Sequence, residues 1–317
     1  MPRFRRVPPA VFPSLLGLLG LVAAWYRAAD VFGVPTALID VAAGMVSPLF
    51  VFFLILYGVK LAHRPGVIIE DASILPGRTG VAALALGCMV LSSLLADRFA
   101  TFATVLLIAG VLILSTLAVW VFLRRIRGTD TAGPITPAMH LVFVGFVLVP
   151  TAATPLTLMA PAMPWLLLYC TLAAGLIIVP TIGALLRAEG APPLRPLHAI
   201  QLAPPAFIAT GLFLTGFDVL GALALVWSVA TGGLLLLRLA WMMEGGFSPM
   251  WAAFTFPVTA IAGALLLGGE SLGMRGLSVG GGVVLILATL YIPVIVVRVL
   301  KLWMSGTLAI KTNTATA

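Results

Sequence analysis

Three prolines that are each followed within three residues by a basic or titratable side chain are the first candidates for chemistry in this sequence. These pairs are Pro76 with Arg78, Pro137 with His140, and Pro196 with His198. Proline is tolerated in the first turn of a helix, and a cation beside it could gather anions at the mouth of a pore. We therefore expect Arg78, His140 and His198 to share one inner vestibule. The alternative is an ordinary helix start whose side chain reaches toward the membrane surface.

Carboxylates are missing from the middle of every long apolar stretch. The acidic residues lie in predicted loops or at the ends of these stretches: Asp30, Asp40, Glu70, Asp71, Asp97, Asp130, Glu189, Asp218, Glu244 and Glu270. Proton relays and sodium-coupled sites generally need a buried carboxylate, so the pattern disfavours coupling to these cations and suits a path for anions. No DxxD, HExxH or Cys/His cluster occurs either, and we expect no enzyme activity, metal or cofactor.

Prolines and phenylalanines inside alternate apolar stretches are a second set of candidates. A proline there frees a backbone carbonyl, which in lipid must find water, a neighbouring group or a passing solute. Aromatic rings that point at a common axis would form a hydrophobic constriction. Packing within the protein or against lipid is the alternative for each residue. The candidates are Pro13, Phe146, Pro150, Pro204, Pro205, Phe207, Phe256 and Pro257.

The elements that must position these residues are long apolar segments. With 62% hydrophobic and 9% charged residues and a mean hydropathy of +1.19, the chain has too little polar surface to coat a soluble globule. Apolar stretches come in pairs that begin near residues 9, 75, 135, 195 and 248. This period predicts an all-α integral membrane protein whose residues 1–317 form a single transmembrane domain of five helical hairpins.

Ten spans are predicted, and they alternate in character. The first member of each pair is interrupted by Pro or Gly, and such helices usually line a cavity in membrane proteins. The second member is a cleaner apolar run that ends in Arg or Lys. The predicted spans are 9–27, 38–61, 75–95, 100–123, 136–157, 162–186, 196–215, 219–242, 248–268 and 276–300.

Basic residues predict the orientation. Of the 18 Lys and Arg residues, only Arg27, Arg98 and Arg275 would lie on one side of the ten-span arrangement, and the other fifteen would lie opposite. The positive-inside rule makes the richer side cytoplasmic. We therefore expect a multi-pass protein of the cell membrane with both termini in the cytoplasm. Because the basic residues are scattered at span ends, they read as topology signals and not as a nucleic-acid surface.

The ninth predicted span carries a familiar stretch, Ser248-Pro-Met-Trp-Ala-Ala-Phe-Thr-Phe-Pro257. It resembles the signature of the tellurite-resistance/dicarboxylate transporter family, which includes the plant slow anion channels. Residues 196–205 look like the seventh span of that family, and Pro9-Ala-Val-Phe12-Pro13 looks like its first. The first span departs from many members, because Phe12-Pro13-Ser14 stands where they carry a Gly-Tyr-Phe-Gly-like stretch.

The resemblance implies ten helices around a pseudo-fivefold central pore that is lined by the odd-numbered spans. By this resemblance Phe256 is the pore gate, Phe12 joins the pore-lining candidates, and the protein assembles as a homotrimer that passes small inorganic or organic anions across the lipid bilayer. The favoured function is an anion channel or uniporter. The alternative is a coupled transporter of C4-dicarboxylate, sulfite or tellurite-type anions, and nothing in the residues separates these solutes. A membrane-embedded enzyme is the third and least supported reading.

Overall fold

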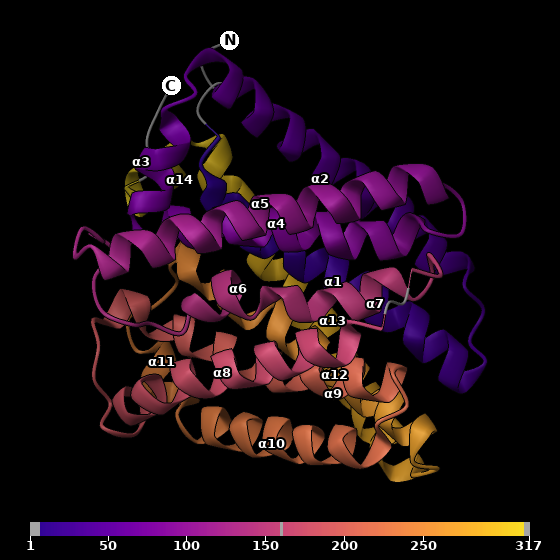
Figure 1. Ribbon diagram of the computed structural model, residues 1–317. Coiled ribbons are helices and arrows are strands. Elements are labelled where there is room, and N and C mark those ends of the chain that lie inside the picture. Colours follow the sequence, from indigo (N-terminus) through magenta and orange to yellow (C-terminus); the bar gives the residue numbers. More distant parts are fainter. Residues whose placement is uncertain (1–6, 159–160, 314–317) are drawn as a thin grey trace.

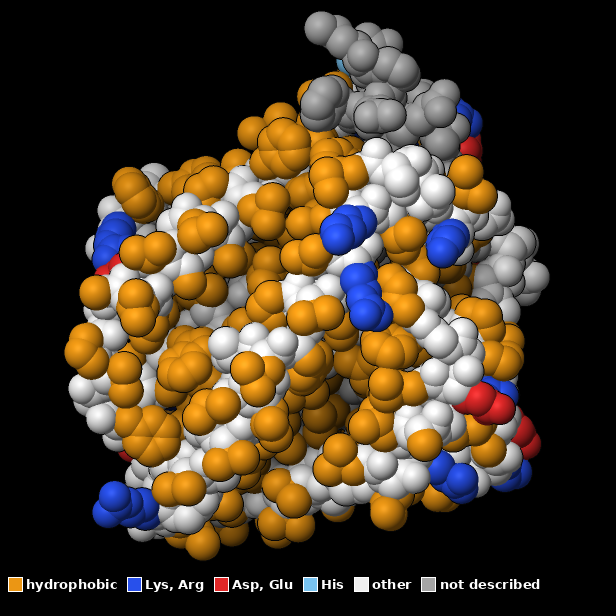
Figure 2. Space-filling model, turned by 180° about the vertical axis from the view of Figure 1, so that it is seen from behind, with side chains coloured by type: hydrophobic (Ala, Val, Ile, Leu, Met, Phe, Trp, Pro, Cys, Tyr) orange, Lys and Arg blue, Asp and Glu red, His pale blue; other side chains and the backbone are white. Residues whose placement is uncertain are grey.

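The computed structural model describes residues 7–158 and 161–313, and within them all regular secondary structure is helical. Nine helices in this described part are long and apolar enough to cross a membrane. The long helices run roughly parallel or antiparallel to one another (Figure 1). Hydrophobic side chains cover most of the face shown in Figure 2, and charged side chains on it are few. The architecture is therefore the helical membrane bundle that the composition predicts.

Five of the nine long helices form the outer layer of the bundle. Between 28% and 39% of the apolar window of each is buried inside the protein, and large side chains such as Leu38 and Leu237 are 84% exposed. Apolar surface on this scale is covered by lipid in a membrane protein. The outer helices are α2 (Ala37–His63), α5 (Ala100–Ile126), α8 (Met163–Leu186), α10 (Asp218–Leu237) and α13 (Arg275–Met304).

The interrupted spans form the inner layer. In the four of them that reach membrane-spanning length, between 72% and 83% of the apolar window is buried. They pack against one another across the centre of the bundle, as the contacts of α1 with α4 and α12 and of α9 with α12 show. The elements are η1 (Pro9–Val11) with α1 (Phe12–Phe32), α4 (Leu75–Leu95), η3 (Pro192–Leu202) with α9 (Ala203–Leu214), and η4 (Pro249–Phe254) with α12 (Phe256–Ser271).

The predicted fifth span, residues 136–157, is not a continuous helix. It consists of α6 (Met139–Phe143), η2 (Gly145–Leu148) and α7 (Val149–Ala153), so the described chain has nine long helices where ten were expected. Gly145 and Pro150 account for the break. A Cβ on Gly145 would lie 2.6 Å from Leu86 Cδ2, so a larger residue there would require the Leu86 side chain of α4 to move. Pro150 lacks the amide proton that would continue a helix through it.

Four inner spans change from a 3₁₀ to an α-helix at a proline. In each, the proline occupies the first or second position of the α-helix that follows the 3₁₀ segment. Proline fits there because the first-turn amide has no intrahelical acceptor in any case. The four residues are Pro13 in α1, Pro150 in α7, Pro204 in α9 and Pro257 in α12. At these four predicted interruptions the structure thus shows a change of helix type.

One end of the bundle carries the short helices and most of the ion pairs. The short helices are α3 (Val67–Ser73), α11 (Leu239–Met243) and α14 (Thr307–Thr312). The last described helix, α14, contacts η1, near the start of the described chain, on this side of the molecule (Figure 1). The Lys60 ammonium, at the end of α2, is fully buried and donates a 2.9 Å hydrogen bond to Asp71 of α3, which also accepts one from the Tyr57 hydroxyl. These bonds tie the first hairpin to α3.

Candidate functional site

Two chambers lie along the centre of the inner layer, one beyond the other. The N-side chamber is about 30 Å³ in volume and is lined by the amino-terminal halves of the inner spans. The C-side chamber is about 80 Å³ and is lined by their carboxy-terminal halves. Each receives residues from all five inner spans. Examples are Pro13, Thr79, Leu141, Ile200 and Pro257 in the N-side chamber, and Gly20, Val90, Thr151, Phe207 and Thr259 in the C-side chamber.

Phe256 separates the two chambers, because its ring is part of the lining of both. The side chain is 5% exposed, and it stacks on Phe207 of α9 with ring centroids 5.2 Å apart and an interplanar angle of 22°. The same two rings border a third, smaller cavity of about 20 Å³ beside the axis. Phe256 thus borders all three spaces, and Phe207 borders two of them.

Glycine on α1 makes room for the Phe256 ring. A Cβ on Gly20 would stand 2.7 Å from Phe256 Cδ2, which is closer than real contacts allow. On the other side of the ring, the backbone changes direction at Thr255, between η4 and α12. The Thr255 hydroxyl donates a 2.7 Å hydrogen bond to the Ala252 carbonyl, which also accepts one of 3.2 Å from the Thr255 amide. The absence of a side chain at Gly20 therefore lets the Phe256 ring lie between α1 and Phe207 of α9.

Several predicted pore residues do border the central spaces. Pro13 and Pro257 line the N-side chamber, Phe207 lines the C-side chamber, and Pro204 lines the small cavity beside the phenylalanine pair. These four come from α1, α9 and α12, whose proline-directed bends bring them to the axis.

Three other predicted pore residues lie elsewhere. Phe12 is fully buried and packs edge-on against Phe50 and Tyr57 of α2, each at 5.8 Å between ring centroids. Phe146 contacts Tyr169 of α8 at 6.4 Å. Pro150 is buried but borders none of the three central spaces. Phe12 and Phe146 thus pack on aromatic side chains of the outer helices α2 and α8, whereas Pro150 lies beside Gly211 of α9. Leu148, two residues beyond Phe146, borders the C-side chamber instead.

Arg78 is braced by a carboxylate and lines none of the central spaces. Its guanidinium is 2% exposed and donates hydrogen bonds of 2.6 and 3.1 Å to the Asp130 carboxylate, in the loop after α5. It also donates one of 2.9 Å to the Ala72 carbonyl. Burial would raise the pKa of Asp130, but the hydrogen bonds from Arg78 and the Ala132 amide outweigh it, so the pKa lies below its usual value. The charge of Arg78 is thus neutralised locally.

The two histidines differ from each other in position. His140 borders the small cavity beside the phenylalanine pair, and neither of its buried ring nitrogens has a hydrogen-bond partner in the described chain. His198 lies within 2.9 Å of the Gln201 amide and against the Trp241 ring. The N-side chamber is instead bordered by the neighbours Thr79, Leu141 and Leu197. The geometry therefore does not unite Arg78, His140 and His198 in one vestibule, and a shared anion-gathering role for them stays a prediction.

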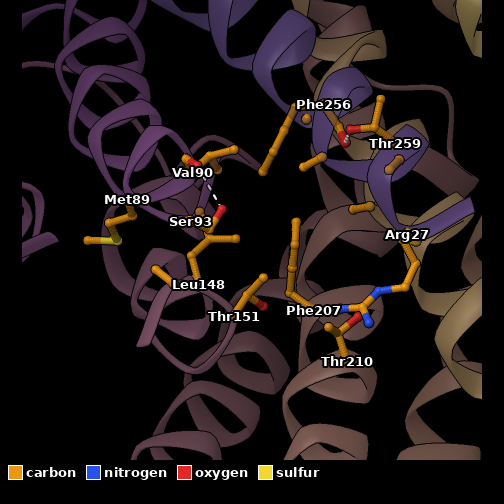
Figure 3. Close-up of a pocket in the computed structure, with 16 residues that line it drawn as sticks. Arg27, Met89, Val90, Ser93, Leu148, Thr151, Phe207, Thr210, Phe256 and Thr259 are labelled. Carbon is orange, nitrogen blue, oxygen red and sulfur yellow. Dashed lines mark hydrogen bonds between the residues drawn. The ribbon is translucent and has the colours of Figure 1, made fainter. Parts of the chain in front are cut away.

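Arg27 of α1 was predicted only as a topology residue, yet it lines the C-side chamber. Figure 3 shows its side chain directed toward Thr210 and Phe207. The sequence does contain a pattern that could have found it, since Gly20, Ala23, Ala24 and Arg27 have the spacing of one helix face, and all four border the chamber. A helix face with three small residues and one arginine, on an interrupted span, would thus have indicated that Arg27 lines a cavity.

Comparison with known proteins gives one family. The family model described as voltage-dependent anion channel matches residues 6–300, which is nearly the whole chain and includes all the inner spans. No curated protein shows a significant match.

Proposed function

Since the chain belongs to the voltage-dependent anion channel family and so passes anions across a membrane, we propose that these anions travel along the axis of the two chambers and that Phe256 is the gate. The observation that carries this proposal is the position of one ring in the lining of both chambers. The resemblance of residues 248–257 to the tellurite-resistance/dicarboxylate transporter family, which includes slow anion channels, agrees with this membership.

In this proposal, transport requires that an anion pass the Phe256 ring, and it requires no coupling ion. An anion enters a chamber, sheds part of its hydration shell, and passes when the Phe256 ring turns aside and the constriction becomes wet. An interior-negative potential drives each negative charge outward with about 2.3 kcal/mol per 100 mV, so the favoured direction is export. Among the described residues no carboxylate lines either chamber. This supports a channel or uniporter over a cation-coupled transporter of C4-dicarboxylate, sulfite or tellurite-type anions.

The finer architecture belongs to the same proposal. We count α6, η2 and α7 together as a tenth crossing, which makes five hairpins around a pseudo-fivefold axis. Two observations support this count: each chamber receives residues from all five inner spans, and the broken segment joins two helices of membrane-spanning length, α5 and α8. Both termini would lie in the cytoplasm, on the side richer in basic residues. The homotrimeric assembly rests on the family resemblance alone.

Anion-replacement currents through the purified protein in planar bilayers test the gate. Phe256→Ala should raise the basal anion conductance several-fold, because removal of the ring joins the two chambers and lets water through. If the ring only packs in a core, the truncation would leave a cavity that costs about 3–5 kcal/mol and would create no current.

Phe254→Ala is the matched control for the gate. Phe254 also lies in the family-like stretch, but its ring packs on Trp251 with centroids 5.9 Å apart, and it borders neither chamber. Its truncation should leave the conductance at the wild-type level. A silent and destabilised Phe256→Ala, or an equal current through both variants, would contradict the gate.

A further inference from the structure

The C-side chamber has one cationic side chain in its lining, that of Arg27. In the described part of the chain, residues 7–158 and 161–313, the guanidinium has no ion pair or hydrogen bond, whereas the buried Arg78 is held by Asp130. Arg27 is only partly exposed, and its side chain lies among those that surround the chamber (Figure 3). A guanidinium in such a place has five N–H donors and no protein acceptor for them.

The other polar side chains of the chamber divide into two kinds. Three hydroxyls already donate to carbonyls of their own helices: Ser93 to Val90 at 2.7 Å, Thr210 to Ala206 at 3.0 Å, and Thr259 to Phe256 at 2.8 Å. The Thr151 hydroxyl is the exception, since its oxygen is buried and has no hydrogen-bond partner in the described chain. A buried hydroxyl without a partner carries a desolvation cost, unless a ligand or water satisfies it.

We propose that Arg27 and Thr151 form an anion-binding subsite in the C-side chamber, selective for small oxyanions such as nitrate or a carboxylate. Arg27 and Thr151 can each donate a hydrogen bond, and the other polar side chains of the chamber already donate theirs to backbone carbonyls. The ligand that would satisfy this lining is therefore a hydrogen-bond acceptor. The planar guanidinium matches two oxygens of an oxyanion at once, whereas it holds a halide as a point charge. The inference rests on the proposed function in treating the chamber as part of the anion path.

The position of the subsite gives it a defined task. It lies on the opposite side of Phe256 from the N-side chamber, so an anion that passes the ring meets a fixed positive charge. A charge in a narrow space with apolar walls raises the local concentration of anions and excludes cations. The N-side chamber has no charged lining residue among those described. The subsite would therefore hold the permeating ion and reject cations, while the ring controls opening.

Binding is tested directly by the thermal unfolding midpoint of the full-length protein in detergent. The midpoint is measured with increasing sodium nitrate or sodium chloride. The sodium salt of a bulky organic anion is added to keep the ionic strength constant. An ion that binds the folded state raises the midpoint with concentration. We expect nitrate to act at lower concentrations than chloride. Arg27→Gln should weaken the apparent nitrate affinity by about tenfold or more, since it removes the charged donors.

Three further variants make the result specific. Arg27→Lys keeps the positive charge but lacks the planar guanidinium that can bind two oxygens at once, so the preference for nitrate over chloride should shrink. Thr151→Val should weaken nitrate affinity by about threefold through loss of one neutral donor, and it tests the subsite independently if Arg27→Gln does not fold. Arg275→Gln removes an exposed cation at the start of α13 that does not line the chamber. It should leave both affinities unchanged.

Unchanged nitrate affinity in Arg27→Gln, or an equal loss in Arg275→Gln, would overturn the subsite. A second measurement separates this result from the proposed function. In the Phe256→Ala background, Arg27→Gln should shift the reversal potential in a salt gradient toward cation permeability. If Phe256→Ala opens no anion path while nitrate still protects through Arg27, the gate is wrong and the subsite stands. If Phe256→Ala conducts and Arg27→Gln alters neither binding nor selectivity, the gate stands and the subsite is wrong.

Discussion

Two phenylalanines that precede prolines show how a single residue acquires its role. Phe12 before Pro13 and Phe256 before Pro257 both open an α-helix at a proline. The Phe12 ring packs on the aromatics of α2, whereas the Phe256 ring fits against Gly20 and turns to the axis. The same local sequence therefore places one ring against the outer helix α2 and the other between the two chambers. The neighbouring side chains decide between these outcomes.

Phe207 is the residue that tests whether the gate is one ring or two. Because Phe207 stacks on Phe256, we expect the two rings to be coupled in stability by about 0.5–1.5 kcal/mol, as aromatic pairs usually are. Unfolding free energies of Phe207→Ala, Phe256→Ala and the double variant in detergent would measure this coupling. In the same cycle, the conductance of the double variant should exceed that of Phe256→Ala only slightly. Full additivity in both measurements would mean that the rings act separately.

At the scale of elements, the inner spans share one construction. A 3₁₀ segment leads into an α-helix at a proline in four of them, and each of these spans contributes lining residues to both chambers. A buried carboxylate that pairs with cations can anchor a loop between two spans. The loop between α5 and α6 has such an anchor in Asp130, which is 5% exposed and pairs with Arg78 and with Arg125.

Asp130→Asn should therefore loosen the attachment of this loop to α4. Removal of one partner from a buried ion pair costs about 3–5 kcal/mol, and we expect a loss near the lower value because the pair lies at the end of the bundle. Because the folded-state pKa of Asp130 is below its usual value, its stabilising effect is complete above the ordinary carboxyl pKa of about 3.9. The effect is lost as the pH falls through the lowered value. Thermal unfolding of both proteins between pH 3 and pH 8 would measure this.

The matched control for Asp130 is Glu189→Gln. Glu189 pairs with Arg187 at the end of α8, with side chains 55% and 64% exposed. Hydrogen bonding from Arg187 lowers the pKa of Glu189 as well, but water competes for this pair and screens it. The variant should unfold as the wild type does at neutral pH. A stability difference for Asp130→Asn that does not narrow toward acid pH would contradict the ion-pair explanation.

On the scale of the whole molecule, the chain is a ring of buried spans inside a ring of exposed ones. This arrangement separates two tasks: the outer helices match the lipid with apolar surface, and the inner helices tolerate prolines and glycines because protein surrounds them. The first and last described elements, η1 and α14, contact each other at the end that carries the short helices. An even number of crossings brings the termini to one side of a membrane, and this agrees with counting the broken fifth segment as a span.

Cysteine labelling tests this orientation in intact cells. Cys88 and Cys170 are buried, so the natural background should be low. Lys311→Cys, in α14, should be protected from a membrane-impermeant maleimide until the membrane is opened. Ser271→Cys, at the exposed end of α12, should react at once. Reaction of both positions in intact cells, or a reversed pattern, would contradict a cytoplasmic carboxy terminus.

The sequence alone was enough to identify a membrane bundle, to locate nine of its long helices within a few residues, and to mark the prolines at which the inner spans bend. These properties follow largely from local composition, because an apolar run of sufficient length must be helical in lipid. Proline alone does not end a helix, since Pro48, Pro180 and Pro293 lie inside the continuous helices α2, α8 and α13. The alternation of broken and clean spans also predicted which helices form the inner layer.

Only the tertiary structure decided which side chains face the axis. Phe146 and Leu148 are two residues apart, and their directions depend on a break set by Gly145 against Leu86. Arg78 meets Asp130 from 52 residues away, while Arg27 meets no carboxylate in the described chain and lines a chamber. The rotation of a helix about its own axis and the pairing of its charges are set by partners distant in sequence. The types and spacing of neighbouring residues therefore could not distinguish Arg78, which pairs with Asp130, from Arg27, which lines the C-side chamber.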